Sequence, residues 1–373
     1  MKVLIVSKAL VMGNHQRKIE FLAAAPDVEV VAVVPPYWRE REVGMIPFER
    51  AYTRGYRMLV RPIALNGSFH LHFWPSLGGL LQREQPDVLH IDEESFNLAT
   101  FQATWLGVRQ GARCLFFNWS NIYRRLPPPF SCFERYNLAQ TTYAVAGNRD
   151  AAEVLRRKGY QGPLAVIPQF GVDEKVFRPP RTSPPTPPPA PGVRVGYAGR
   201  LVRQKGVLDL LEAVAGLPQA QLLLVGRGAL EVSLRQRAEQ DDLRGRVQFA
   251  GWVPSADLPS LYRRLDVLVL PSRTRPNWKE QFGRVLIEAM ACGIPVVGSD
   301  SGQIPHVIGE AGLVFPEGDI AALQERLEHL RRDPALREEL GRRGRERVLA
   351  HYTQERVAQA YLQVYRDMTQ PPT

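Results

Sequence analysis

The chain has 373 residues, of which 45% are hydrophobic and 23% are charged, and its formal net charge is +10. This composition is typical of a soluble globular protein, the length favours two domains, and no apolar run reaches the ~18–20 residues of a membrane span. The positive charge could attract nucleic acid, anionic lipid headgroups or phosphorylated substrates, although a merely solvated basic surface explains it equally well.

The first half alternates short apolar strands with amphipathic helical stretches, which predicts an α/β fold with a doubly wound parallel sheet. The predicted strands are 3–6, 28–34, 88–91, 114–117, 143–146 and 165–167. The predicted helices are 16–25, 98–110 and 149–158. A proline-rich run then covers 178–192, which can form neither a helix nor a central strand and is expected to be an extended, exposed spacer.

The second half repeats the same alternation. Its predicted strands are 193–198, 222–225, 247–249, 267–270, 296–297 and 312–315, and helices are expected to begin near Gly206, Gly228, Ala256 and Gly283. A charged helical run follows Ile320, with breaks near 333–334 and 351–353. We therefore predict a first domain at 1–172, a linker at 173–192, a second domain at 193–352 and a C-terminal helix at 353–373.

Two acids, Glu280 and Glu288, frame the start of the helix expected after Gly283. Glu288 lies between two apolar residues, where a carboxylate costs desolvation free energy unless something hydrogen-bonds it. Glu280 precedes the helix, beside N-terminal amides that attract anions. The outer acid could bind sugar hydroxyls, the amides a phosphate, and the inner acid both ribose hydroxyls. The plainer alternative is a capping Glu280 and a partly exposed Glu288 on an ordinary helix.

This run resembles the E-x7-E signature of retaining glycosyltransferases with the GT-B fold, in glycosyltransferase family 4 (glycosyl transferases group 1). The resemblance covers nearly the whole chain and is strongest over 193–316. It implies two Rossmann-like domains, each with a doubly wound parallel sheet, facing across a cleft. The nucleotide-sugar donor would bind the C-terminal domain and the acceptor the N-terminal domain. The last helix would return to the first domain, with Val357, Tyr361 and Val364 as its packing face.

Two cations, Arg200 and Lys205, flank the loop after strand 193–198. Cations placed there stabilise a departing diphosphate without proton transfer. The family's G-R-x(n)-K-G element matches this loop, although a basic loop at a strand end is the structural alternative. The donor-binding residues that the resemblance implies are Gly13, Arg200, Lys205, Val253, Glu280, Gln281, Phe282, Gly283, Arg284, Val285 and Glu288.

Three positions depart from the family pattern. Only Gly13 remains of a glycine pair after the first strand, and Gln303 stands where a second glycine is usual. Many relatives carry a histidine after the strand at 114–117, whereas this chain has Asn118. The predicted catalytic residues are Glu280, Arg200 and Lys205 from the donor motifs, together with Asn118 in the place of the histidine.

Asp92, Glu93 and Glu94 follow the strand at 88–91, and ligands of doubly wound sheets bind at the carboxyl ends of strands. Either acceptor binding or helix capping would explain them. His15 begins a helical stretch and could contact an acceptor phosphate, and Asn121 could bind the sugar. The predicted acceptor-binding residues are His15, Glu93, Glu94 and Asn121.

No metal or cofactor is expected, because the sequence has no Asp-x-Asp pair and no His/Cys cluster with ligand spacing. The three cysteines, Cys114, Cys132 and Cys292, do not form a disulfide framework, and Cys114 and Cys292 are expected to be buried. These features predict a cytoplasmic protein. No nucleic-acid-binding pattern accompanies the charge, so the expected partners exclude nucleic acid and include a peripheral contact with the anionic inner face of the plasma membrane.

The predicted function is transfer of a sugar from a nucleoside-diphosphate sugar to a glycan or lipid-linked acceptor, in polysaccharide, glycolipid or cell-envelope glycan synthesis. One alternative is a nucleotide-sugar epimerase on the same fold, which needs further acid/base residues around the sugar. None of the seven histidines stands in the donor motifs. The other alternative is a non-catalytic nucleotide-sugar-binding protein, against which the intact motif residues argue.

Overall fold

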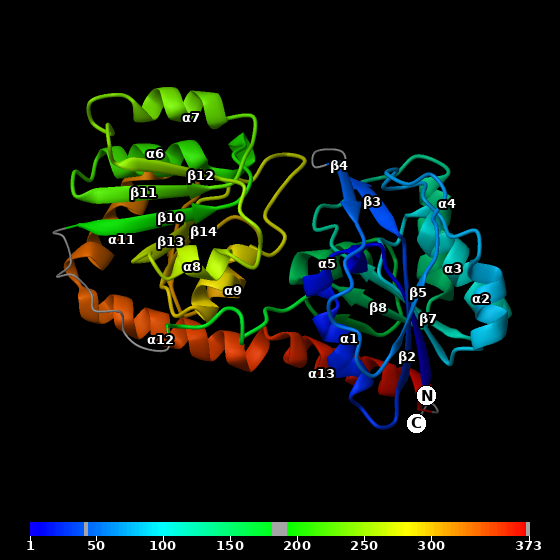
Figure 1. Ribbon diagram of the computed structural model, residues 1–373. Helices are drawn as coiled ribbons and strands as arrows, with labels where there is room; N and C mark the ends of the chain where they lie inside the picture. Colours follow the sequence, from blue (N-terminus) through cyan, green and yellow to red (C-terminus); the bar gives the residue numbers. More distant parts are fainter. Residues whose placement is uncertain (41–43, 181–191, 371–373) are drawn as a thin grey trace. The chain divides into compact units, whose positions relative to one another are not determined.

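The computed structural model describes residues 1–40, 44–180 and 192–370, and the chain divides into two compact units (Figure 1). Unit 1 comprises Met1–Gly171 and Gln354–Thr373, and unit 2 comprises Val172–Thr353. Most of the proline run predicted as a linker, residues 181–191, lies outside the described residues.

Unit 1 is built on a seven-stranded sheet with the order β5-β2-β1-β6-β7-β8-β9. All of its strand pairs are parallel, and the order reverses between β1 and β6, as expected of a doubly wound sheet. Its strands are β1 (Lys2–Val6), β2 (Glu29–Val34), β5 (Arg57–Val60), β6 (Val88–Ile91), β7 (Arg113–Asn118), β8 (Tyr143–Ala146) and β9 (Leu164–Val166).

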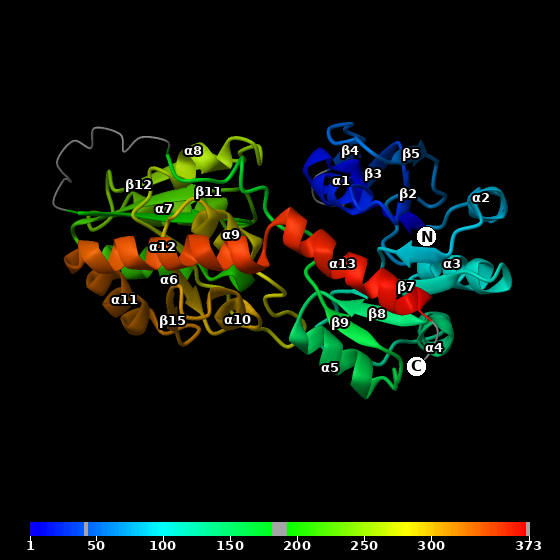
Figure 2. The ribbon, with the colours of Figure 1, turned by 90° about the horizontal axis from the view of Figure 1, so that it is seen from below.

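Helices cover both faces of this sheet. A Cβ at Gly107 of α3 (Leu98–Arg109) would meet Leu89 of β6, whereas the next strand residue, His90, contacts Tyr361 and Tyr365 of α13 (Gln354–Thr369). Neighbouring strand residues point to opposite faces, so α3 and α13 lie on opposite sides (Figure 2). The predicted packing face of the last helix is confirmed, because its three residues are buried in the core of unit 1. The other helices are α1 (Arg17–Ala23), α2 (Leu77–Glu84), α4 (Phe130–Gln140), α5 (Arg149–Arg157) and the 3₁₀ turns η1 (Ala9–Val11) and η2 (Gly13–His15).

Several elements of unit 1 were not predicted. The antiparallel hairpin of β3 (Tyr37–Glu40) and β4 (Gly44–Pro47) stands outside the main sheet, and most of its residues are not buried. Helix α4 buries Glu134 and Asn137, which are polar, so it lacks the apolar periodicity that identifies a helix.

Unit 2 has a six-stranded parallel sheet with the order β12-β11-β10-β13-β14-β15, which reverses between β10 and β13. Its strands are β10 (Val193–Ala198), β11 (Ala220–Val225), β12 (Val247–Gly251), β13 (Val267–Leu270), β14 (Val296–Ser299) and β15 (Leu313–Phe315). Its helices are η3 (Arg203–Lys205), α6 (Val207–Ala215), α7 (Glu231–Ala238), α8 (Leu258–Tyr262), α9 (Arg284–Ala291), α10 (Ile304–Ile308), α11 (Ile320–Arg332) and α12 (Pro334–His351). The six predicted strands of this half are confirmed, and β10 and β13 have the predicted bounds.

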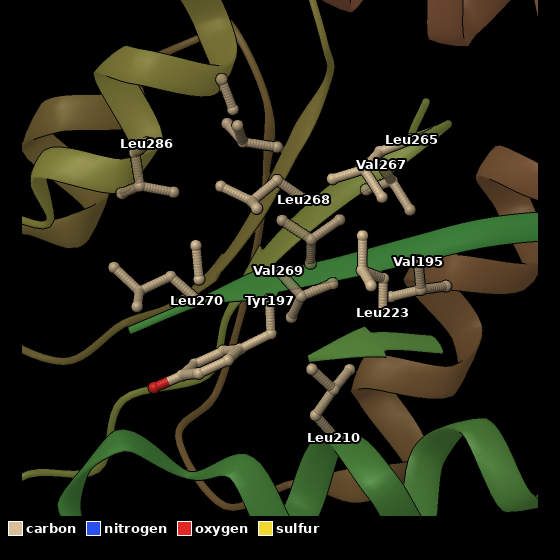
Figure 3. Packing of buried hydrophobic residues seen from close by; sticks show 14 of the residues in the cluster. Val195, Tyr197, Leu210, Leu223, Leu265, Val267, Leu268, Val269, Leu270 and Leu286 are labelled. Atoms are coloured by element: carbon tan, nitrogen blue, oxygen red, sulfur yellow. The ribbon is translucent and has the colours of Figure 1, made fainter. Parts of the chain in front are cut away.

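The core of unit 2 fills both faces of the sheet. Figure 3 shows side chains of β10 and β13 between Leu210 of α6 and Leu286 of α9. All of these residues have almost no exposed surface. The central strands therefore form a rigid support for the loops at their carboxyl ends.

Gly206 fixes the turn between η3 and α6. Its φ is +64°, and a Cβ at this position would lie 1.8 Å from the carbonyl oxygen of Pro271. We expect Gly206→Ala to lower the free energy of unfolding of unit 2 by more than about 3 kcal/mol, since backbone strain and a clash with main-chain atoms add together. Urea denaturation would measure this loss.

Gly245→Ala is the matched control for Gly206→Ala. Gly245 has a φ of +74°, and a Cβ at this position would meet nothing within 4 Å, so backbone strain alone should cost about 1 kcal/mol. Equal losses in the two variants would contradict the packing argument.

Candidate functional site

The predicted donor residues of unit 2 gather where the order of the sheet reverses. Lys205 follows β10 in η3, and Ser272 and Glu280 follow β13. Since β10 and β13 are parallel neighbours, their carboxyl ends lie together, and this edge is where doubly wound sheets bind ligands.

Glu280 is held by two donors at one carboxylate oxygen. The Lys205 Nζ lies 2.6 Å from Glu280 Oε2, and the Ser272 hydroxyl donates to the same oxygen at 2.7 Å. The Lys205 ammonium also lies 5.1 Å from the centre of the Trp278 ring. Glu280 is only 6% exposed. The sequence predicted separate roles for Lys205 and Glu280, and the structure shows that they form one ion pair.

A turn after β14 supports the backbone of Glu280. The backbone amide of Gln303 donates to the backbone carbonyl oxygen of Glu280 at 3.2 Å. Gly302 has a φ of +56°, and a Cβ there would lie 2.1 Å from the same oxygen. This close approach requires glycine at position 302.

Glu288 lies inside α9 and is 3% exposed, which excludes the alternative of a partly exposed acid. Arg284 Nε lies 2.9 Å from Glu288 Oε1, and the Tyr262 hydroxyl donates to Oε2 at 3.0 Å. Burial raises the pKa of Glu288, although Arg284 and Tyr262 both favour the carboxylate. The expectation that something must hydrogen-bond this acid is confirmed.

The remaining predicted donor residues differ in their exposure, and one of them lies in unit 1. Arg200 is exposed in the loop after β10, where its carbonyl accepts a 2.7 Å bond from the Tyr197 hydroxyl. Gly283 has a φ of +80° and caps the start of α9. Of the others in unit 2, Gln281 is exposed, whereas Val253, Phe282 and Val285 are half-buried. Gly13 lies in η2 of unit 1, where its amide donates to Glu49 at 2.9 Å.

A second polar cluster lies in unit 1, at the carboxyl ends of β1 and β6. The Ser7 hydroxyl donates to Asp92 Oδ2 at 2.6 Å. Lys8 Nζ pairs with Glu93 Oε2, and His72 Nε2 lies 3.3 Å from Glu93 Oε1. Burial alone would raise the pKa of Glu93, but the nearby Lys8 and His72 hold it at about 2.

Glu94 connects this cluster to the loop after β7. Its carboxylate accepts bonds from the backbone amides of Trp119 at 3.1 Å and Ser120 at 3.4 Å. Asn121 of the same loop is buried, and so is Asn118 at the end of β7, whose Oδ1 has no hydrogen-bond partner among the described residues. Of the predicted acceptor residues, Glu93, Glu94 and Asn121 are therefore buried at this edge.

His15, at the end of η2, is buried as well. Its ring stacks on Phe170 with a centroid distance of 3.9 Å, and its Nδ1 lies 2.9 Å from the Ala9 carbonyl oxygen.

The pKa of Glu94 predicts a pH-dependent stability. Burial raises this pKa from 4.5 to about 7, so between these values the folded chain keeps a proton that the unfolded chain loses. The contribution of Glu94 to the free energy of unfolding is complete below pH 4.5, falls as the pH rises, and is lost above pH 7, by up to about 3 kcal/mol. Urea denaturation at pH 5 and at pH 8 gives the free energy of unfolding that each chain loses between these pH values. This loss should be smaller in Glu94→Gln than in the unmodified chain. Identical losses would contradict a raised pKa.

Sequence reasoning missed five polar residues of these clusters. Ser7, Lys8 and Ser272 directly follow or nearly follow predicted strands, so the rule that ligands bind at strand ends could have found them. Tyr262 and His72 gave no such signal, because each reaches its partner from a distant segment.

Comparisons with known proteins identify a family domain in this chain. Residues 184–347 match the model of the family described as glycosyl transferases group 1. The chain carries a domain of this family. The group 1 domain includes the Lys205–Glu280 pair and the Arg284–Glu288 pair.

Two curated relatives cover part of the chain. The lipopolysaccharide core biosynthesis glycosyltransferase LpsE of Rhizobium meliloti is 33% identical over 60% of this chain and 64% of its own length. A GDP-mannose-dependent mannosyltransferase of Corynebacterium glutamicum, named for acting on a monoacylated phosphatidylinositol monomannoside, is 37% identical over 42% of each chain. The chain thus spans less than two thirds of the length of these relatives.

Solved structures match nearly the whole chain. Sucrose-phosphate synthase from Thermosynechococcus elongatus has a TM-score of 0.72, with 23% identity over 99% of both chains. The Anabaena protein Alr3699/HepE, in complex with UDP, also has a TM-score of 0.72, with 18% identity over 98% of this chain and 100% of that chain. These likenesses confirm the GT-B fold, with two doubly wound α/β units. The placement of the two units across a cleft stays a prediction.

Cys114 and Cys292 are buried, as expected. Within the described ranges, no helix has the length and the apolar character needed to cross a bilayer.

Proposed function

We propose that the chain is a retaining glycosyltransferase that moves a sugar from a nucleoside-diphosphate sugar to an acceptor hydroxyl. The observation that carries this proposal is the Lys205–Glu280–Ser272 cluster at the strand reversal of a group 1 domain. The Anabaena protein Alr3699/HepE, which has the same fold, was solved with UDP and with UDP-glucose.

The cluster suits a donor whose diphosphate leaves. An ammonium has three N–H donors, and Glu280 takes one of them, so Lys205 can hold Glu280 and a phosphate oxygen at the same time. Arg200 adds a second cation at the same edge, and these charges stabilise the diphosphate as it departs. We propose that they do so without a bound metal or cofactor.

The two acids have separate roles in this proposal. Glu280, fixed by Lys205 and Ser272, accepts hydrogen bonds from the sugar hydroxyls and positions the ring. Glu288, fixed by Arg284 and Tyr262, accepts hydrogen bonds from the ribose hydroxyls. The transition state resembles an oxocarbenium ion between the departing diphosphate and the incoming hydroxyl. The diphosphate oxygen itself takes the proton of that hydroxyl, so retention needs no enzyme nucleophile.

Unit 1 would bind the acceptor. Its polar cluster at the ends of β1 and β6 offers carboxylates to hydroxyl groups, and Asn118 Oδ1 can accept a hydrogen bond from a sugar. We propose a glycan or lipid-linked acceptor from envelope glycan synthesis, since LpsE is named for lipopolysaccharide core biosynthesis. A cytoplasmic protein with a basic surface could meet such an acceptor at an anionic membrane.

A panel of nucleoside-diphosphate sugars tests this proposal. The thermal shift of each donor identifies the one that binds, because a ligand specific to the folded state raises the midpoint of unfolding. Incubation with that donor and a panel of acceptors should give a transferred sugar, and NMR should show the anomeric configuration of the donor retained. An epimerised donor, or binding without turnover in the presence of every acceptor, would instead support the two alternatives.

A further inference from the structure

An exposed aromatic ring lies beside the polar cluster of unit 1. Phe69, in the segment between β5 and α2, is 46% exposed. The Lys8 ammonium lies 4.7 Å from the centre of its ring and 5.3 Å from the centre of the buried Trp38 ring. An exposed ring beside a few polar groups offers the apolar platform and the orienting contacts that a small ligand needs.

The segment that carries Phe69 is held in place by hydrogen bonds and ring contacts of the neighbouring residue. The His70 carbonyl accepts a 2.9 Å bond from the Leu98 amide at the start of α3. The His70 ring meets the Phe69 ring edge-on at 5.1 Å, and its Nδ1 lies 3.2 Å from Asn97 Oδ1. A ring held in this way loses little conformational entropy when a ligand binds it.

The charged groups beside the Phe69 ring favour a ligand that carries hydroxyl groups over a ligand that carries phosphate groups. Lys8 pairs with Glu93, which leaves further N–H donors of the ammonium for a ligand oxygen. The carboxylate of Asp92 lies in the same cluster and would repel an anion. Hydroxyls can donate to carboxylates and accept from an ammonium, so a neutral polyol satisfies both.

We propose that Phe69 and Lys8 bind a neutral sugar ring of the acceptor, with the apolar face of the sugar on Phe69 and a hydroxyl at the Lys8 ammonium, which the buried Glu93 holds in place. The inference rests on the proposed glycosyl transfer and names the acceptor class as a saccharide or glycoside. The geometry has the usual parts of a selective site, an apolar platform with a few polar groups that fix orientation.

The test uses the full chain and three variants. Phe69→Ala removes the platform, Phe69→Trp keeps it, and Leu65→Ala is the matched control, because Leu65 is 57% exposed in the same segment. The probes are methyl hexopyranosides and maltose, with glycerol 1-phosphate and vesicles of phosphatidylglycerol as rivals. Titrations followed by saturation-transfer NMR measure binding of the soluble probes, and co-sedimentation measures binding to the vesicles.

We expect at least one glycoside to bind, with an affinity about fivefold lower in Phe69→Ala and nearly unchanged in Phe69→Trp and Leu65→Ala. Equal binding by Phe69→Ala, binding of glycerol 1-phosphate alone, or binding of no glycoside would overturn the inference. The affinity for nucleoside diphosphates is measured in parallel. If the nucleotide binds and the glycosides do not, only this inference fails, whereas loss of both would overturn the proposed function as well.

Discussion

Replacing Glu280 with glutamine is expected to lower the turnover number by at least about 100-fold. The affinity for the free nucleoside diphosphate should change by less than about threefold, because the proposal places Glu280 on the sugar. One carboxylate oxygen of Glu280 accepts bonds from both Lys205 and Ser272. A neutral amide oxygen accepts hydrogen bonds from the sugar hydroxyls more weakly than a carboxylate does, so the sugar contact is weakened in the transition state, whereas the amide oxygen can still accept a bond from the Lys205 ammonium. Steady-state kinetics and isothermal titration measure the two quantities separately.

Glu231→Gln is a suitable control for this variant. Glu231 also pairs with a cation of unit 2, Arg235 at 2.9 Å, but it lies on the surface helix α7. Turnover should be unchanged in the control. If Glu280→Gln and Glu231→Gln had the same turnover, Glu280 would have no role in the reaction.

Replacing Glu288 with alanine is expected to weaken nucleoside-diphosphate binding by at least about tenfold, since the ribose hydroxyls lose their acceptor. The same change should lower the free energy of unfolding by about 1–3 kcal/mol, because it leaves the buried Tyr262 hydroxyl and Arg284 without this partner. Titration calorimetry well below the unfolding midpoint separates the binding loss from the stability loss.

Glu288→Gln separates the charge from the shape of this side chain. The amide keeps an oxygen that can accept from Tyr262, so most of the stability should return. Nucleotide affinity should recover only in part, because an amide cannot accept two hydroxyl bonds as strongly as a carboxylate. Unchanged nucleotide affinity in both variants would show that ribose does not bind at Glu288.

The central strands were the most predictable part of the fold. The four residues of β13 are all apolar and fully buried, and a short, continuous apolar run of this kind identifies a strand covered on both faces. In contrast, most residues of β3 and β4 are not buried and α4 buries polar residues, so these elements do not show the expected hydrophobic period.

Candidate site residues were predictable where a motif places them on one element. The spacing of Glu280 and Glu288 predicted one acid before α9 and one inside it, and the structure agrees. The partners of these acids were not predictable from local pattern. Lys205 and Glu280 are 75 residues apart and meet only because β10 and β13 are neighbours, and Lys8 and Glu93 are 85 residues apart.

A crystal structure with the nucleoside diphosphate that gives the largest thermal shift tests the central claim most directly. The account predicts phosphate oxygens within hydrogen-bond distance of Arg200 and Lys205 and of the backbone amides at the start of α9, with the ribose hydroxyls at Glu288. Phosphates bound away from both Arg200 and Lys205 would contradict it.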